Sequence, residues 1–327
     1  MKVLITGVSG FAGSHLAEYV LSLGHEVTGT IRTRSPLENL TAVQDRIKLA
    51  TCELTDPHSV RRLFADYSPD CVFHLAAQSF VQASWNHPEQ TMMNNIVSQL
   101  NLLEAIRERG FNPMFLVAGS SEEYGKVRLN DFPITEAIPL KPLSPYGVSK
   151  VAQDLLGYQY HQSYGLNIIR TRAFNHTGPR RGEVFVTSNF AKQIVEIERG
   201  EREAVIKVGN LDAERDFTDV RDVVRAYFAI LQDGRPGDVY NIASGKARTI
   251  ASVLDMLISI SKVKVKIEVD KSRLRPSDLP KLEGSYEKVK SAVGWQPTIS
   301  FEQTMADLLD WWRARFRAGY RPSEQRH

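Results

Sequence analysis

The sequence predicts an α/β protein built on a doubly wound parallel sheet. Short apolar runs rich in β-branched residues alternate with amphipathic helical stretches, which is the pattern of β-α-β units. The first apolar run, residues 2–6, is followed directly by Gly7, Gly10 and Gly13 and then by a helical stretch. This order of strand, glycine turn and helix is typical of a Rossmann-type dinucleotide-binding unit.

The three glycines have distinct roles in such a unit. Gly7 allows a sharp turn, Gly10 lets the backbone approach a pyrophosphate, and Gly13 permits tight packing of the helix on the strand. The start of the helix offers unpaired N–H groups to the anion. We include Phe11, which lies inside this turn, in the predicted cofactor site.

Composition is typical of a globular protein without a nucleic-acid or membrane partner. The chain has 327 residues, 42% hydrophobic and 24% charged, with a formal net charge of only +3. No apolar run approaches the ~20 residues that span a bilayer, and the first strand begins almost at Met1, so we expect no signal peptide. The two cysteines form no paired motif, which favours a reducing compartment and no structural metal. We therefore expect a cytoplasmic protein.

Further strands are predicted at residues 26–31, 47–52, 71–75, 113–118 and 166–174, and helices at 59–67, 91–109, 145–164 and 223–231. A chain of 327 residues is long enough for two domains. We expect an NADP-binding Rossmann domain over residues 1–174, with a returning segment near 216–245. Residues 175–327 are expected to form mainly a smaller α/β substrate-binding domain, with a frayed polar tail from residue 315.

The end of the second strand indicates which cofactor is bound. NAD-binding units usually place a carboxylate there, whereas NADP-binding units place arginine near the 2′-phosphate. This chain has Arg32 and Arg34 and no carboxylate, which favours NADP and leaves NAD possible. Further along, Glu53 is positioned to accept from the adenine amino group. The small residues after the fourth strand let the cofactor approach, and the remaining predicted cofactor contacts are Leu54, Leu75, Ala76 and Ala77.

Tyr146 and Lys150 are the best catalytic candidates, because residues four apart share one face of a helix. A neighbouring ammonium lowers the pKa of a phenol, and such a tyrosine can exchange a proton with a sugar hydroxyl during hydride transfer. Ser120 lies at the end of the fifth strand, where it can hydrogen-bond the same substrate oxygen.

Several motifs together resemble the extended short-chain dehydrogenases/reductases that modify nucleotide sugars, and the match covers nearly the whole chain. The resemblance is to the branch of GDP-mannose 4,6-dehydratase and GDP-4-keto-6-deoxymannose reductase. It implies a catalytic triad of Ser120, Tyr146 and Lys150, with Glu122 as the dehydratase acid/base. The motifs are GVSGFAG at 7–13, HLAAQS at 74–79, SSEEYG at 120–125, SPYGVSK at 144–150 and FNH at 174–176.

Two reactions fit this resemblance. Elimination of water needs a carboxylate beside the tyrosine, whereas reduction of a ketone does not, so Glu122 favours a lyase, the 4,6-dehydratase. Residues 179–187 also look like the dehydratase loop that reaches a neighbouring subunit's cofactor. Against this, the dehydratase pattern continues with an arginine and a lysine where this chain has Ser188 and Asn189. The segments 209–220, 275–280 and 301–312 look more like the reductase, an oxidoreductase. We favour the dehydratase narrowly and keep the reductase as the alternative; a non-catalytic NADP-binding sensor is a remote third.

The remaining predictions concern substrate and assembly. Asn175 follows the sixth strand at the edge of the cleft, and Arg215 and Arg275 suit diphosphate recognition in a GDP-hexose. The single His176 is expected to be a packing residue. The helices from residues 91 and 145 are expected to pair across a two-fold axis into a homodimer, which the 179–187 loop extends to a tetramer. The resemblance adds three substrate contacts, Ser79, Ser121 and Val186.

Overall fold

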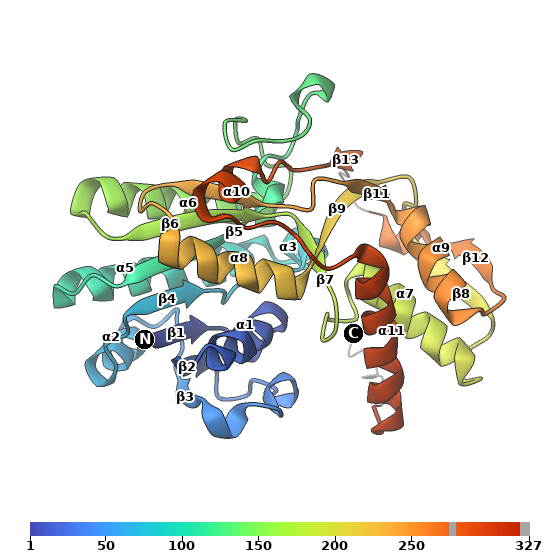
Figure 1. The fold of residues 1–327 in the computed structure, drawn as a ribbon, viewed down its shortest axis with the longest axis horizontal. Coiled ribbons are helices and arrows are strands. Elements are labelled where there is room, and N and C mark those ends of the chain that lie inside the picture. Colours follow the sequence, from blue (N-terminus) through green and yellow to red (C-terminus); the bar gives the residue numbers. More distant parts are fainter. Residues whose placement is uncertain (275–278, 321–327) are drawn as a thin grey trace.

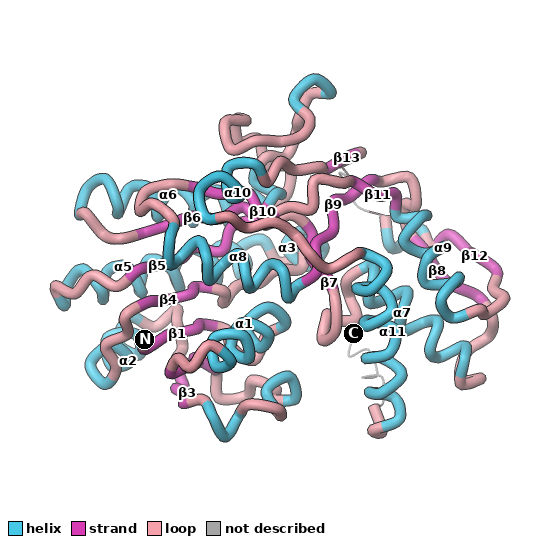
Figure 2. Tube along the Cα trace, in the orientation of Figure 1, coloured by secondary structure: helices cyan, strands magenta, loops and turns pink. Residues whose placement is uncertain are grey.

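The structure, a computed structural model, describes residues 1–274 and 279–320. Its largest element is a seven-stranded parallel sheet with strand order β10-β6-β5-β4-β1-β2-β3 (Figures 1 and 2). Strand order reverses beside β1, as in doubly wound sheets, so the predicted fold class is confirmed. The strands are β1 (Lys2–Thr6), β2 (Glu26–Ile31), β3 (Lys48–Thr51), β4 (Cys71–His74), β5 (Met114–Ser120), β6 (Ile168–Ala173) and β10 (Val239–Ile242).

Helices cover both faces of this sheet, which is why its central strands are apolar throughout. Val3 and Ile5 of β1 pack into the core on the side of α1 (Phe11–Ser22) and α8 (Val220–Asp233). Leu4 packs into the core on the opposite side. That second face is covered by α2 (Pro57–Asp66), α5 (Ser98–Arg109) and α6 (Pro145–Tyr164), while α10 (Glu287–Val293) lies against α8 and β10.

A second group of elements follows β6 and lies beside the carboxyl ends of the large sheet (Figure 1). Its own core contains Phe190, Leu254, Leu308 and Trp312. The strands form two small sheets, in which β9 (Glu214–Asp219) pairs with β7 (Asn175–Thr177), β11 (Ala247–Thr249) and β13 (Lys281–Leu282), and β8 (Val205–Val208) pairs with β12 (Lys266–Val269). The helices are α7 (Val186–Glu198), α9 (Ile250–Ser261) and α11 (Phe301–Arg317).

The helix predicted over 91–109 is interrupted in the structure. It consists of α4 (Pro88–Met92), a π-helical turn at Met93–Val97 and then α5, with the short α3 (Val81–Asn86) before them. Asn95 in the π turn is fully buried. Its side chain forms hydrogen bonds with the segment after β4 and with α6. π turns occur often at functional sites, and this one lies under the cavity described below.

Two further differences from the sequence prediction concern the start of α8 and the end of α11. The α8 helix begins at Val220, earlier than predicted, because the Asp219 carboxylate accepts from the Arg221 N–H at 2.8 Å and caps it. Asp222 in the first turn of α8 is buried and accepts from the backbone of Thr298 and Ile299. The α11 helix continues to Arg317, so the predicted fraying at 315 is wrong for the described part of that tail.

Candidate active site

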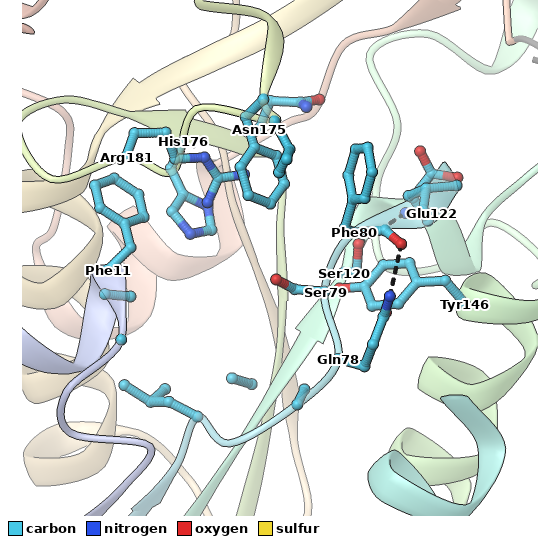
Figure 3. A pocket seen from close by; sticks show the side chains of 18 of the residues that line it. Phe11, Gln78, Ser79, Phe80, Ser120, Glu122, Tyr146, Asn175, His176 and Arg181 are labelled. Atoms are coloured by element: carbon cyan, nitrogen blue, oxygen red, sulfur yellow. Dashed lines mark hydrogen bonds between the residues drawn. The ribbon is translucent and has the colours of Figure 1, made fainter. Parts of the chain in front are cut away.

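A cavity of about 890 Å³ opens at the carboxyl ends of the parallel strands, where doubly wound sheets bind their ligands (Figure 3). Of the predicted site residues that the structure describes, all except Arg34 border it; Arg275 lies outside the described residues. The residues that border it are Gly7, Gly10, Phe11, Gly13, Arg32, Glu53, Leu54, Leu75, Ala76, Ala77, Ser79, Ser120, Ser121, Glu122, Tyr146, Lys150, Asn175, Val186 and Arg215.

The glycine turn has the geometry that a dinucleotide requires. Gly7 adopts φ +69°, and a Cβ there would lie 2.9 Å from the Ala76 Cα. A Cβ at Gly13 would lie 2.3 Å from the Gly7 carbonyl oxygen. Gly10 precedes α1 and supplies no side-chain cap, so the first N–H groups of α1 remain available to an anion at the cavity.

The adenosine end is formed by the turns after β2 and β3. Arg32 borders the cavity together with Ser35, whose Oγ accepts from the Arg32 N–H at 2.9 Å. Arg34 is exposed and does not border the cavity, because the turn directs it away. Glu53 borders the cavity, and its Oε1 accepts from the Thr55 hydroxyl at 2.9 Å. Of the two predicted arginines, Arg32 is therefore the one that borders the cavity.

The catalytic candidates meet where α6 passes the end of β5. Lys150 Nζ donates to the Ala118 carbonyl oxygen at 2.8 Å and lies 5.9 Å from the centre of the Tyr146 ring. Burial lowers the pKa of Lys150 to about 8, while the Glu123 charge opposes that shift. Ser120 forms a hydrogen bond with the Tyr146 hydroxyl.

The predicted lowering of the Tyr146 pKa is not the net effect in this structure. Burial raises the pKa of the Tyr146 hydroxyl, and the hydrogen bond from Ser120 and the Arg181 charge oppose the rise. The physical reason is that Tyr146 is buried while the Lys150 ammonium is directed to the backbone of β5. Among the largest influences on this pKa, Ser120 and Arg181 are the two that favour the phenolate.

Asn95 fixes the segment that follows β4. Its Oδ1 accepts from the Gln78 N–H at 2.8 Å, and its Nδ2 donates to the Gln78 carbonyl at 3.1 Å and to Ser149 Oγ at 2.9 Å. Gln78 Nε2 in turn donates to the Phe80 carbonyl at 2.9 Å (Figure 3). The π turn thus ties one wall of the cavity to α6.

Glu122 borders the same cavity as the triad, on the turn after β5 that starts at Ser120 (Figure 3). Its N–H donates to Ser120 Oγ at 3.2 Å, and its charge raises the pKa of Tyr146. A carboxylate therefore lies beside the serine and the tyrosine, as a reaction with two proton transfers needs.

The wall opposite the triad is formed by an aromatic and cationic group that the sequence did not reveal (Figure 3). Phe11 and His176 stack with ring centres 5.8 Å apart. The Arg181 guanidinium lies 4.9 Å from the centre of the Phe11 ring and 3.4 Å from that of Phe185. Burial lowers the pKa of Arg181 to about 9 and that of His176 to about 4.

The backbone conformation of Arg180 explains why the next side chain, that of Arg181, points into the cavity. Arg180 adopts φ +72°, a left-handed conformation that non-glycine residues rarely take. Its guanidinium donates to Glu18 at 2.5 Å and to the Asn39 carbonyl at 3.2 Å. The loop at 179–187 therefore packs against α1 and the segment at Asn39 of its own chain, and its predicted reach to a neighbouring subunit stays a prediction.

The far end of the cavity is formed by the second group of elements. Arg215 Nη1 donates to the Leu279 carbonyl at 2.7 Å, and Arg273 Nη1 donates to Asn189 Oδ1 at 2.6 Å. Phe185 precedes α7 without a side-chain cap, so a second helix start faces the cavity. Arg273 and Asn189 were missed as site residues, because their meeting depends on packing between distant segments.

The described residues show neither a cluster of three or more His, Cys, Asp or Glu that could hold a metal ion, nor a helix long and apolar enough to cross a membrane. Cys52 and Cys71 are free and buried.

Known proteins match this chain along its whole length. A GDP-6-deoxy-D-mannose reductase of Pseudomonas aeruginosa is 34% identical, covering 97% of this chain and 98% of its own. A GDP-mannose 4,6-dehydratase of Vibrio cholerae is 33% identical, covering 94% of this chain and 92% of its own. The structure of RMD from Pseudomonas aeruginosa complexed with NADPH is 32% identical with a TM-score of 0.84, covering 96% of this chain and 99% of that one.

A more distant structure shares the same fold. The UDP-glucose 4-epimerase of Thermotoga maritima with UDP-glucose is 29% identical with a TM-score of 0.87, covering 97% of this chain and 100% of that one. The family model described as GDP-mannose 4,6 dehydratase matches residues 4–308. The chain therefore belongs to the GDP-mannose 4,6-dehydratase family, within the extended short-chain dehydrogenases/reductases.

Proposed function

We propose that this protein is an NADP-dependent GDP-mannose 4,6-dehydratase that produces GDP-4-keto-6-deoxymannose by internal hydride transfer. The observation that carries the proposal is the position of Glu122, which borders one cavity with Ser120, Tyr146 and Lys150. Loss of water across two carbons requires a base for one proton and an acid for the departing hydroxyl. Tyr146 alone supplies one such group, and Glu122 beside it supplies the other.

NADP fits the phosphate-binding end of the cavity. The uncapped start of α1 would hold the pyrophosphate, and Arg32 would hold the 2′-phosphate. When bound, the nicotinamide exchanges a hydride with the sugar. The P. aeruginosa structure complexed with NADPH supports this choice.

The chain's own residues supply the proton transfers. Tyr146 takes the proton of the 4-hydroxyl, while Ser120 holds the phenolic oxygen by a hydrogen bond. Glu122 takes the C5 proton as the base of the elimination, and Tyr146, which now carries the proton of the 4-hydroxyl, gives it to the 6-hydroxyl, which departs as water. Lys150 is held beside Tyr146 by the Ala118 carbonyl and keeps a positive charge near the reacting oxygen.

The sugar nucleotide fits the far end of the cavity. The uncapped start of α7 and the guanidinium of Arg181 offer positive charge to a diphosphate. Asn175 lies between this group and the triad in Figure 3. We assign the nucleotide to the wall that contains Arg215 and Arg273, with Ser79, Ser121 and Val186 as further contacts.

Reduction of GDP-4-keto-6-deoxymannose is a second candidate, which would give a GDP-6-deoxyhexose such as GDP-rhamnose. The specific observation in its favour is that the P. aeruginosa reductase matches this chain over 98% of its own length. Reduction uses Tyr146 as the acid and does not require Glu122.

The deciding experiment compares the parent protein with the Glu122→Gln variant, which keeps shape but cannot transfer protons. A dehydratase converts GDP-mannose to a 4-keto sugar with catalytic NADP. Its variant should accumulate reduced cofactor without releasing a 6-deoxy product.

The opposite result would identify the reductase. In that case the parent leaves GDP-mannose unchanged, and the variant reduces the 4-keto-6-deoxy sugar with stoichiometric consumption of NADPH. Absence of both activities, with NADP still bound, would instead indicate a sensor.

We also propose the domain and assembly assignments that follow from this function. Residues 1–174, with the returning segment near 216–245, hold the cofactor, and residues 175–327 mainly hold the sugar nucleotide. One face of α6 leaves Leu155 and Tyr158 exposed at 54% and 46%, which supports pairing of two copies through the helices from residues 91 and 145. The site of action is the cytoplasm.

A further inference from the structure

Glu123, next to the proposed acid/base Glu122, is a carboxylate that the mechanism above does not use. Its side chain is fully buried, whereas isolated buried carboxylates are costly and need partners. It belongs to a group of buried charged side chains on the turn after β5, on α6 and on β6. The members are Glu123, Lys150, Asp154, Arg170 and Arg172, all below 9% exposure.

The Glu123 carboxylate is directed back at the start of its own turn. Its Oε1 accepts from the Ser120 N–H at 2.7 Å. A Cβ at Gly119 would lie 2.5 Å from that same oxygen, so glycine at 119 leaves the room the carboxylate occupies. Glu122 N–H donates to Ser120 Oγ at 3.2 Å. Ser120 is thus fixed at its backbone and at its hydroxyl oxygen, which leaves the hydroxyl proton for Tyr146.

The other carboxylate oxygen of Glu123, Oε2, shares the nearby cation Arg172 with Asp154. Arg172 Nε lies 3.2 Å from Oε2, but this N–H donates to Asp154 Oδ2 at 3.0 Å. Asp154 also accepts from Arg170 Nη1 at 2.6 Å. Within the described residues, Glu123 Oε2 makes no hydrogen bond. Burial and the Asp154 charge raise the pKa of Glu123, whereas the charges of Arg172 and Lys150 and the hydrogen bond from the Ser120 N–H lower it. The ionised form of this carboxylate therefore depends on the cations beside it.

Lys150 is the cation on which we expect the Glu123 charge to act. It donates to the Ala118 carbonyl, two residues before the Ser120 amide that binds Glu123, so both side chains converge on the end of β5. Burial lowers the pKa of Lys150, and the Glu123 charge raises it. Without that charge, one carboxylate, Asp154, would face three buried cations.

We propose that Glu123 is a positioning residue for the catalytic centre, which fixes the Ser120 backbone and keeps Lys150 protonated. The charged and titratable groups that face it are Lys150, Asp154 and Tyr146 from α6, Arg172 from β6, and Tyr124 from its own turn. The inference rests on the proposed function, because it assigns Lys150 a charge that the reaction needs.

The test uses Glu123→Gln, which keeps the acceptor for the Ser120 N–H and removes the charge. Loss of a nearby negative charge lowers the pKa values of Lys150 and Tyr146, so both limbs of the kcat–pH profile should move to lower pH by about 1 unit. Glu136→Gln is the matched control. Glu136 Oε1 accepts from the Asn241 N–H at 2.7 Å in the same region, and it does not border the cavity. Its profile should equal that of the parent.

A second variant separates position from charge. Glu123→Asp keeps the charge and withdraws the carboxylate from Ser120 by one methylene. Its basic limb should stay in place while kcat falls roughly tenfold or more, since small misplacements at a reacting centre cost that much. This variant also decides the matter if Glu123→Gln fails to fold: parent-like kcat in Glu123→Asp would overturn the proposal.

A readout without turnover keeps the result independent of the substrate assignment. In the absence of cofactor, Lys150 is labelled with acetic anhydride across pH and quantified by mass spectrometry. The pH of half-maximal reactivity should fall in Glu123→Gln and stay unchanged in Glu136→Gln. Equal midpoints in all three proteins would overturn the proposal, whereas a shifted midpoint in a protein that converts neither sugar would refute only the proposed function.

Discussion

The position of Arg32 leads to a quantitative prediction about cofactor choice. Of the two arginines after β2, Arg32 borders the cavity and Arg34 does not. A hydrogen bond to a charged group contributes about 1.5–3 kcal/mol when shielded. Arg32 is exposed to solvent, so the lower end applies, and about 1.4 kcal/mol corresponds to tenfold in affinity. Arg32→Ala should therefore raise the Kd for NADP about tenfold.

NAD and the neighbouring arginine provide the controls. NAD lacks the 2′-phosphate, so its Kd should change less than about twofold in Arg32→Ala, as for a surface substitution. Arg34→Ala removes the same charge as Arg32→Ala, and it should leave the Kd values for NADP and NAD near those of the parent. Titration of both cofactors by isothermal calorimetry at one fixed salt concentration measures all of these. Equal losses for NADP and NAD, or a larger effect at Arg34, would refute the assignment of the 2′-phosphate to Arg32.

Three further predictions concern catalysis, assembly and stability. Tyr146→Phe should lower turnover by at least ~100-fold with cofactor still bound, the lower end for general acid–base catalysis, and near-normal turnover would exclude the tyrosine from the mechanism. Leu155→Glu, or the same change at Tyr158, should convert a dimer to a monomer in sedimentation at micromolar concentration, and a monomeric parent would contradict the proposed pairing. Because burial lowers the pKa of His15 and His176 to about 4, below the unfolded value of about 6.5, stability should fall as pH drops from 6.5 towards 4. Chemical denaturation across that range should show the loss, which replacement of either histidine by Gln should reduce.

The parts of the site that sequence predicted depend on local order along the chain. Gly7 and Gly10 lie between a strand and a helix, and Gly13 lies in the first turn of that helix. This order along the chain is enough to predict the turn. Tyr146 and Lys150 share a helix face by spacing. Ser120 follows from the end of a buried strand, although β5 extends to Ser120 itself, two residues further than predicted.

Arg181 shows what local order cannot predict. Its guanidinium reaches the cavity because Arg180 takes a left-handed conformation, which no residue type at 180 indicates. That conformation is held by Glu18 and the Asn39 carbonyl, more than 140 residues earlier. The sequence could show an Arg-Arg pair in a loop, but not which of the two would face a ligand.

The charge distribution around the candidate catalytic residues is even harder to predict from local sequence order. Strand pairing sets Gly119 opposite Arg172 and Ser120 opposite Ala173, which brings a buried guanidinium beside the Glu123 carboxylate. The Glu123 carboxylate accepts from the Ser120 N–H within its own turn. Its position beside Arg172 depends on the register of β5 and β6. The proposed role of Glu123 thus depends on a pairing between segments about fifty residues apart, and a one-residue slip in that register would remove it.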